Sequence, residues 1–111
     1  YIIFMNKVNI SNKVYKFRYM NIIMGKLLEF YGTECVHCHE MFPDIDKLEK
    51  EEGVKIEKLE IWHDSKNKAR YDKCNNTIKC TGVPYFYNEN SGKGICGIVD
   101  YEGLKKWAKG K

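Results

Sequence analysis

The sequence lacks any hydrophobic run close to the roughly 20 residues that a transmembrane helix needs. It has only two prolines among 111 residues, and it contains no internal repeat. Hydrophobic residues make up 43% of the chain and charged residues 31%, which is the balance of an ordinary globular protein. General disorder is therefore excluded. We expect one domain with its own core and no membrane partner.

Acidic residues are absent from positions 1–24. Four cations in this segment account for the whole formal net charge of +4, so residues 25–111 are neutral overall; the four are Lys7, Lys13, Lys16 and Arg18. A neutral body behind a basic leader is weak support for nucleic-acid binding, and we expect no nucleic-acid partner. We expect the leader to be either poorly ordered or an extra edge strand. Its apolar start is too short for a signal-peptide core, so the cytoplasm and an organelle lumen both stay open as compartments.

The five cysteines are an odd number, so at least one thiol is free, pairs between molecules or turns over. This count argues against a purely structural disulfide scaffold. Cys35 and Cys38 are separated by two residues and lie between an apolar run, Leu27–Tyr31, and a segment with helical periodicity, Val36–Glu52. Two cysteines with this spacing at a strand-to-helix turn are typical of a redox dithiol.

Hydrophobic periodicity predicts four strands and three helices after Gly25, in the order β-α-β-α-β-β-α. The expected strands are Lys26–Tyr31, Val54–Ile61, Val83–Tyr87 and Ile95–Val99; the expected helices are Val36–Glu52, one from about Ser65 to Cys74, and a closing one around Leu104, Trp107 and Ala108. A hairpin turn is expected at Asn88–Gly94. Pro43 lies inside the first helix and should bend it, because proline removes a backbone donor.

Disulfide exchange needs a thiolate, and the N-terminus of a helix favours negative charge. We therefore expect Cys35 at that end, exposed, as the attacking thiol. Cys38 would lie one turn inward as the resolving thiol. His37, when protonated, would stabilise the Cys35 thiolate, whereas Glu34 would oppose it. The sequence does not decide the direction of electron flow.

From Gly25 to Ala108 the chain resembles the thioredoxin family. The resemblance is carried by the dithiol together with Glu29 six residues before it, Pro43 five residues after it, the loop Gly82-Val83-Pro84, Gly97 and Leu104. It implies a thioredoxin-like α/β fold of three layers, with a mixed sheet flanked by helices and with Val54–Trp62 as the central strand. It implies that Glu29 is a buried carboxyl that assists proton transfer from Cys38. It also implies that Pro84 is a cis-proline beside the dithiol, where Val83, Pro84 and Val36 contact a peptide substrate.

Several positions differ from the family's pattern. Glu34 replaces the tryptophan that usually precedes the first cysteine, and Val36-His37 replaces Gly-Pro between the cysteines. Tyr85 stands where threonine is common, and the stretch from Tyr71 to Pro84 is longer than usual. These differences favour a specialised substrate over the standard thioredoxin partners.

Other interpretations of the cysteines stay open. A zinc site could use Cys35, Cys38, Cys74 and Cys80, although the spacing of the second pair is wider than zinc sites usually have. Copper could bind the dithiol with His39, but neighbouring helix positions point in different directions, which favours a solvated histidine. Cys74, Cys80 and Cys96 could be buried small residues, a relay, or in part a Cys74–Cys80 disulfide. A thioredoxin-fold binding module with an idle dithiol is a further alternative.

From these observations we predict a thiol–disulfide oxidoreductase. The Cys35–Cys38 pair would exchange with protein disulfides through a mixed disulfide. No metal or organic cofactor is expected, and electrons would come from or go to a reductase, glutathione or an oxidase. We expect a monomer whose domain covers residues 25–111.

Overall fold

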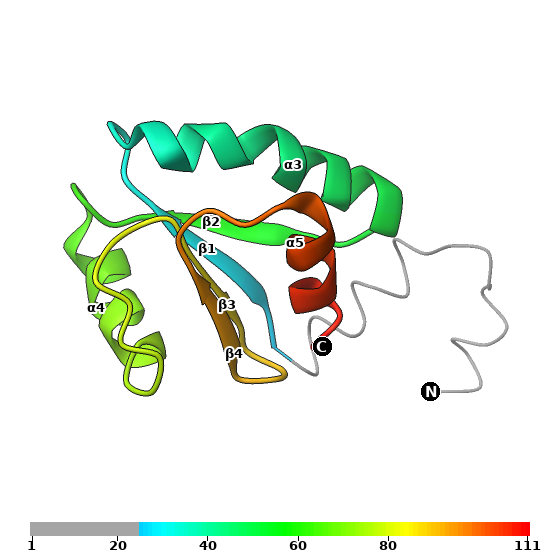
Figure 1. Ribbon diagram of the computed structural model, residues 1–111. Helices are drawn as coiled ribbons and strands as arrows, with labels where there is room; N and C mark the ends of the chain where they lie inside the picture. The colour runs from blue at the N-terminus through cyan, green and yellow to red at the C-terminus, as the bar shows by residue number, and fades with distance from the viewer. Residues whose placement is uncertain (1–24) are drawn as a thin grey trace, which may run out of the picture.

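The structure is a computed structural model that describes residues 25–111 (Figure 1). The predicted basic leader, residues 1–24, lies outside the described residues. The elements follow the predicted order: β1 (Leu27–Tyr31), α3 (Val36–Glu52), β2 (Ile56–Glu60), α4 (Ser65–Cys74), β3 (Tyr85–Asn88), β4 (Lys93–Cys96) and α5 (Tyr101–Ala108). No helix in this part of the chain has both the length and the apolar content to cross a bilayer.

The four strands form one mixed sheet in the order β2-β1-β3-β4. Strands β1 and β2 are parallel and are joined by the crossover helix α3, whereas β3 pairs antiparallel with both β1 and β4. Within residues 25–111, β2 is an outer strand of the sheet and β1 is an inner one. The resemblance had placed the central strand at Val54–Trp62, so that assignment is not met in the described part.

Side chains on β1 alternate between two cores, as a strand requires. Leu27 packs with Ile45 of α3 and Leu104 of α5, whereas Leu28 packs with Tyr71 of α4 and with residues of the other sheet face. Helices α3 and α5 thus cover one face of the sheet and α4 the other, as Figure 1 shows. The predicted α/β fold of three layers is confirmed.

The first two helices begin and end where the sequence signals place them. Asp64 caps α4 by accepting the N–H groups of Lys66 and Asn67, and Gly53 ends α3 in the left-handed region at φ 66°. Pro43 lies inside α3 without interrupting it. Capping side chains and a left-handed glycine are local signals, which is why these boundaries could be found from sequence.

The two C-terminal strands are displaced from their predicted positions. The predicted strand Val83–Tyr87 is observed at Tyr85–Asn88, because Pro84 has no N–H for the ladder and the strand begins after it. The predicted strand Ile95–Val99 is observed at Lys93–Cys96, and it ends at Gly97, whose φ is 100°.

Candidate active site

Cys35 is the N-cap residue of α3, and its sulfur accepts the N–H of Cys38 at 3.3 Å. The Cys35 N–H donates in turn to the Gly32 carbonyl oxygen at 3.0 Å, which closes the turn between β1 and the helix. The sulfur therefore sits where unpaired N–H groups and the helix dipole favour a negative charge. Both cysteines are free thiols, and the structure brings them together as the spacing predicted.

Cys35 is less accessible than predicted. The residue is only 8% exposed, so the expectation of an exposed thiol is wrong for this conformation. The Val83 carbonyl oxygen lies 3.9 Å from the sulfur and covers one side of it. The Val83–Pro84 peptide is cis, and the Gly97 N–H donates to the Pro84 carbonyl oxygen at 2.8 Å. The predicted site residues Cys35, Val83 and Pro84 are therefore neighbours, and the loop from the other end of the chain encloses the thiol.

Glu29 and Cys38 lie beneath the exposed end of the site, and both residues are fully buried. Glu29 shares a sheet face with Leu27, toward α3, and neither of its carboxylate oxygens has a hydrogen-bond partner. Burial raises the pKa of Glu29 to about 8, although Lys58 acts to lower it. Burial also raises the pKa of Cys38 to about 12, with further contributions from the hydrogen bond to Cys35 and from the charges of Cys35 and Glu29. The expectation that Glu29 is a buried carboxyl is met.

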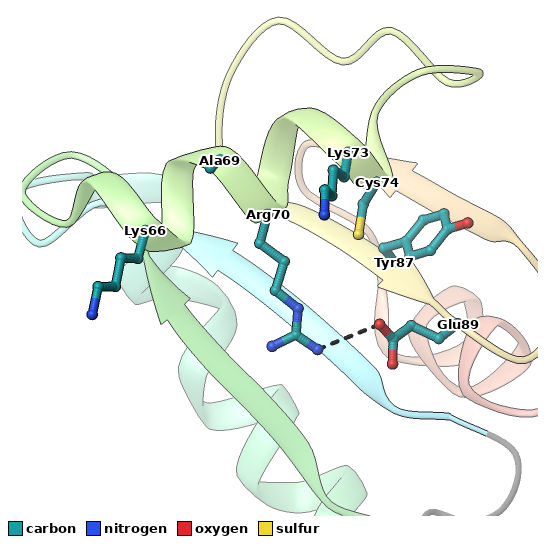
Figure 2. A pocket seen from close by; sticks show the side chains of 7 residues that line it. All are labelled: Lys66, Ala69, Arg70, Lys73, Cys74, Tyr87 and Glu89. Carbon is teal, nitrogen blue, oxygen red and sulfur yellow. Dashed lines mark hydrogen bonds and ion pairs between the residues drawn. The ribbon is translucent and has the colours of Figure 1, made fainter.

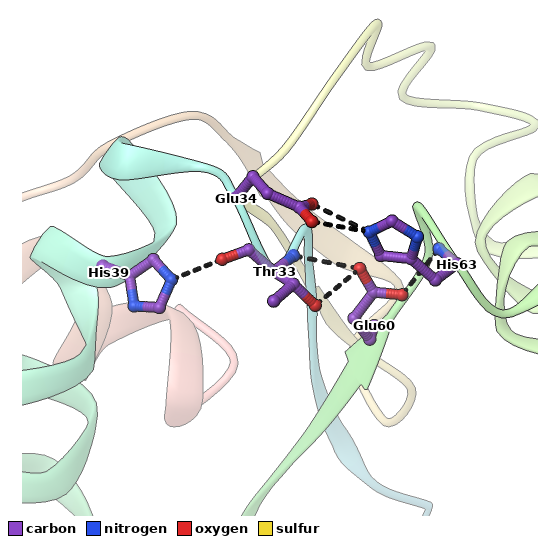
Figure 3. A network of polar contacts seen from close by, with 5 residues as sticks. All are labelled: Thr33, Glu34, His39, Glu60 and His63. Carbon is purple, nitrogen blue, oxygen red and sulfur yellow. Dashed lines mark hydrogen bonds and ion pairs between the residues drawn. The ribbon is translucent and has the colours of Figure 1, made fainter.

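The turn before Cys35 is held by a network of polar contacts that the sequence did not reveal (Figure 3). Glu60 accepts the backbone N–H and the hydroxyl of Thr33 at 2.9 and 3.0 Å, and its other oxygen accepts the N–H of His63 at 2.8 Å. The His63 ring lies 2.8 Å from Glu34, and this hydrogen bond, with the Glu34 charge, raises the pKa of His63. The network joins the end of β2 to the residue that precedes Cys35.

The same three side chains, Glu34, Glu60 and His63, are the group of residues in the described part of the chain that could hold a metal ion, with ligand atoms within 4.8 Å of one another. Both oxygens of Glu60 and Nε2 of His63 already have partners inside the network, however. The cluster is thus satisfied by its own hydrogen bonds, and its arrangement fits a clamp on the turn.

The two histidines of the dithiol stretch point to other partners. Nδ1 of His37 lies 3.1 Å from Glu40 on the exposed side of α3, and Nε2 of His39 lies 2.7 Å from the Thr33 carbonyl oxygen. Stabilisation of the Cys35 thiolate by His37 stays a prediction. His39 takes part in the local hydrogen bonding of the turn.

The remaining cysteines differ from every arrangement considered from sequence. Cys80 and Cys96 form a disulfide with a Cα–Cα distance of 5.4 Å, and Cys74 is a free, half-buried thiol. A Cys74–Cys80 disulfide is therefore wrong, and the proposed zinc set is broken because Cys80 is already bonded. Register in the β3–β4 hairpin, which places Cys96 opposite Tyr85, was the available signal for Cys96. The sequence did not predict the path of the loop that brings Cys80 to Cys96.

Three large hydrophobic side chains of the described residues are exposed, and all three lie next to this site. Val36, which is 69% exposed, follows Cys35 directly. Trp62 is 51% exposed, and its ring packs so closely on Gly32 that a Cβ there would lie 2.3 Å from it. Ile98 is 54% exposed and follows Gly97, which is hydrogen-bonded to the Pro84 carbonyl. We call Val36, Trp62 and Ile98 the apolar rim.

A pocket of about 440 Å³ lies away from the dithiol, between α4 and the end of β3 (Figure 2). Three of its seven lining residues are basic, and Arg70 forms an ion pair with Glu89 at 3.3 Å. Cys74 also lines this pocket, and burial raises the pKa of its thiol. The pocket contains no residue of the predicted site, so we do not assign it to the dithiol chemistry.

Comparison with known proteins agrees with the fold. No family model matches the chain, and no curated protein matches it. Among solved structures, the chain is similar to one described as the structural basis of the thiol resolving mechanism in yeast mitochondrial 1-Cys peroxiredoxin via glutathione/thioredoxin systems. The identity is 21% and the TM-score 0.54, over 91% of this chain and 89% of that one. At this identity the similarity supports the thioredoxin-like fold.

Proposed function

We infer that this protein is a thiol–disulfide oxidoreductase that exchanges the Cys35–Cys38 pair with disulfides of protein substrates. The observation that carries this proposal is the position of the Cys35 sulfur. It caps α3 and accepts the Cys38 N–H at 3.3 Å, with a buried unpaired carboxyl, Glu29, behind the pair. A helix N-terminus lowers the free energy of a thiolate, and the thiolate is the nucleophile in disulfide exchange.

In the reducing direction, the Cys35 thiolate attacks one sulfur of a substrate disulfide. A Cys35–substrate disulfide forms, the substrate's own S–S bond breaks, and the second substrate sulfur leaves as a thiolate that takes up a proton. Cys38 then attacks the Cys35 sulfur, which forms the Cys35–Cys38 disulfide and releases the first substrate sulfur. Two electrons pass from the dithiol to the substrate, and the reverse sequence oxidises a substrate dithiol. A reductase, glutathione or an oxidase would restore the starting state.

The second step needs a thiolate at Cys38, whose pKa is raised to about 12 in the reduced protein. Part of that increase comes from the hydrogen bond and the charge of Cys35. Both disappear once the Cys35 sulfur is bonded to substrate, so the first step itself lowers the pKa of Cys38. Glu29 has a pKa near 8, so its ionised form, which is a minor fraction at neutral pH and predominates above pH 8, can then accept the Cys38 proton. The role predicted for Glu29 is thus a proton acceptor for the resolving thiol.

The apolar rim supports a protein substrate. Val36, Trp62 and Ile98 are exposed on segments that adjoin Cys35, Gly32 and the Pro84 carbonyl, and an apolar peptide segment would cover them. The Val83 carbonyl oxygen, 3.9 Å from the Cys35 sulfur, belongs to the loop where the resemblance places peptide contacts, and the Pro84 side chain of this loop is fully buried.

The test is reduction of insulin disulfides with dithiothreitol as electron source. We expect wild-type protein to accelerate the reaction and Cys35→Ser to lose the acceleration by at least about 100-fold, since it removes the thiol that sits at the N-terminus of α3. Cys74→Ser is the matched control, because it removes a free thiol outside the site and should keep full activity. Equal rates for wild type and Cys35→Ser would overturn the proposal and favour a binding module with an idle dithiol.

A further inference from the structure

The Cys80–Cys96 disulfide joins the two segments that flank the Val83–Pro84 peptide. Cys80 precedes Val83 by three residues, and Cys96 pairs with Tyr85, the residue that follows Pro84. The chain between the two cysteines therefore includes the loop that lies against the Cys35 sulfur. The disulfide closes this part of the structure covalently, with a sequence separation of 16 residues.

Hydrogen bonds tie the same loop to α4. The Tyr71 hydroxyl donates to the carbonyl oxygens of Cys80 and Gly82 at 3.1 and 2.8 Å. The Asn75 side chain bonds both backbone groups of Cys80, at 2.6 Å each. The start of the loop is thus fixed to α4 by hydrogen bonds and to β4 by the disulfide. Besides the disulfide, a hydrogen bond from the Gly97 N–H to the Pro84 carbonyl oxygen, 2.8 Å long, ties the loop to the end of β4.

We propose that the Cys80–Cys96 disulfide regulates disulfide exchange at Cys35 and Cys38. While it is intact, it holds the Val83–Pro84 loop in place beside Cys35; when it is reduced, the loop loosens and Cys35 engages peptide disulfides more slowly. This inference rests on the function proposed above, and it makes the second cysteine pair a redox-sensitive control of the first.

The two sulfurs differ in accessibility, which decides how the bond is reduced. Cys80 is 6% exposed, whereas Cys96 lies on the exposed end of β4. An external thiolate of the glutathione type therefore attacks Cys96. A Cys96–thiol mixed disulfide forms, the Cys80–Cys96 bond breaks, and Cys80 leaves as a thiolate that takes up a proton. A second external thiolate then releases Cys96 and forms the external disulfide, so two electrons pass from two external thiols to the protein.

The loop contributes to binding a peptide but not to the attack on a small disulfide, and this difference gives the test. The double variant Cys80→Ser/Cys96→Ser, wild type and the control Cys74→Ser are assayed with insulin and with hydroxyethyl disulfide. We expect kcat/KM for insulin to fall about fivefold or more in the double variant, and the rate with hydroxyethyl disulfide to stay within about twofold. The control should match wild type with both substrates.

The outcomes separate this inference from the proposed function. If wild type reduces insulin through Cys35 and the double variant does so equally well, the regulation is overturned and the function stands. A parallel loss with insulin and hydroxyethyl disulfide also overturns it, because a general structural defect would affect both. If wild type shows no reduction that depends on Cys35, the function fails and the regulation fails with it.

A measurement on wild type keeps the test valid if the double variant does not fold. Full-length protein is equilibrated in glutathione buffers of increasing reducing strength, and alkylation with mass mapping gives the redox state of each pair. The insulin rate per reduced Cys35 should fall as the reduced fraction of Cys80–Cys96 rises. A rate independent of that fraction, or a Cys80–Cys96 bond that folded protein never releases to glutathione, overturns the inference.

Discussion

The two cysteine pairs of this protein are built in opposite ways. Cys35 and Cys38 belong to one helix turn, are both free, and face a buried carboxyl. Cys80 and Cys96 come from two segments, are joined by a bond, and brace a loop. The first pair has an environment that affects protonation, whereas the second pair affects the position of its neighbours. This difference suggests that one pair carries the chemistry and the other shapes the place where it happens.

The largest expected effect concerns Glu29, the buried carboxyl that lies next to the Cys35–Cys38 pair and not next to the Cys80–Cys96 pair. Its pKa is about 8 in the folded protein against 4.5 for the ordinary group, so the folded state holds a proton that the unfolded state releases. The contribution of Glu29 to the free energy of unfolding is therefore fully present below pH 4.5. As the pH rises to about 8 this contribution is lost, and the free energy of unfolding falls by at most about 5 kcal/mol. We expect Glu29→Gln to remove this decline in urea unfolding measured from pH 4.5 to 8.

The exposed carboxyl of Glu102 provides the control for that experiment. Glu102→Gln should keep the wild-type pH dependence. If Glu29→Gln also keeps it, burial does not raise the pKa of Glu29, and the carboxylate would be too weak a base to take the proton of Cys38.

The second effect concerns the covalent link that only the other pair provides. A disulfide across 16 residues stabilises a protein by about 3 kcal/mol by restricting the unfolded chain. We expect Cys80→Ser/Cys96→Ser to lose about this much unfolding free energy in urea titration. Cys35→Ser is the comparison, because serine is a good N-cap residue and should change stability by less than about 1 kcal/mol. Equal losses of unfolding free energy in Cys80→Ser/Cys96→Ser and in Cys35→Ser would contradict the conclusion that the two cysteine pairs have different roles.

A smaller effect is expected at the apolar rim. Trp62→Ala should raise KM for insulin about fivefold with little change in kcat, because it removes apolar contact area but no reacting group. Hydroxyethyl disulfide, which is too small to cover the rim, serves as the control substrate and should react at the wild-type rate. An unchanged KM for insulin would place the substrate on another surface.

The smallest effect concerns the clamp on the turn before Cys35. The hydrogen bond and charge of Glu34 raise the pKa of His63, so Glu34→Gln should move that pKa back toward its ordinary value near 6.5. Proton NMR titration of the His63 ring measures the shift. The His37 ring, which pairs with Glu40 and not with Glu34, is the internal reference for the spectra. A His63 pKa that does not move would show that the clamp does not form in solution.

Sequence predicts those residues of the site whose positions are determined by neighbouring residues in the chain. Cys35 and Cys38 follow from their spacing at a strand-to-helix turn, and the alternation of β1 places Glu29 on a buried face. The strands, the helices and their order follow from periodicity, and the three-layer fold follows from the resemblance to the thioredoxin family. These features depend on residues close together in the chain.

The features that sequence missed depend on long-range geometry. The Cys80–Cys96 disulfide requires the path of the loop before β3, which nearby residues do not determine, in addition to the β3–β4 register. The contact between Glu34 and His63 spans 29 positions. The low exposure of Cys35 has the same origin, because the Val83 loop that covers it lies 48 positions away.

Trapping of the mixed disulfide shows directly which thiol attacks the substrate. Cys38→Ser, a variant that keeps Cys35 but has no resolving thiol, is incubated with insulin and analysed by mass mapping of all cysteines. We expect the variant to accumulate a stoichiometric adduct on Cys35, whereas wild type releases it and ends with a Cys35–Cys38 disulfide. An adduct on Cys74 instead, or no adduct at all, would contradict this expectation.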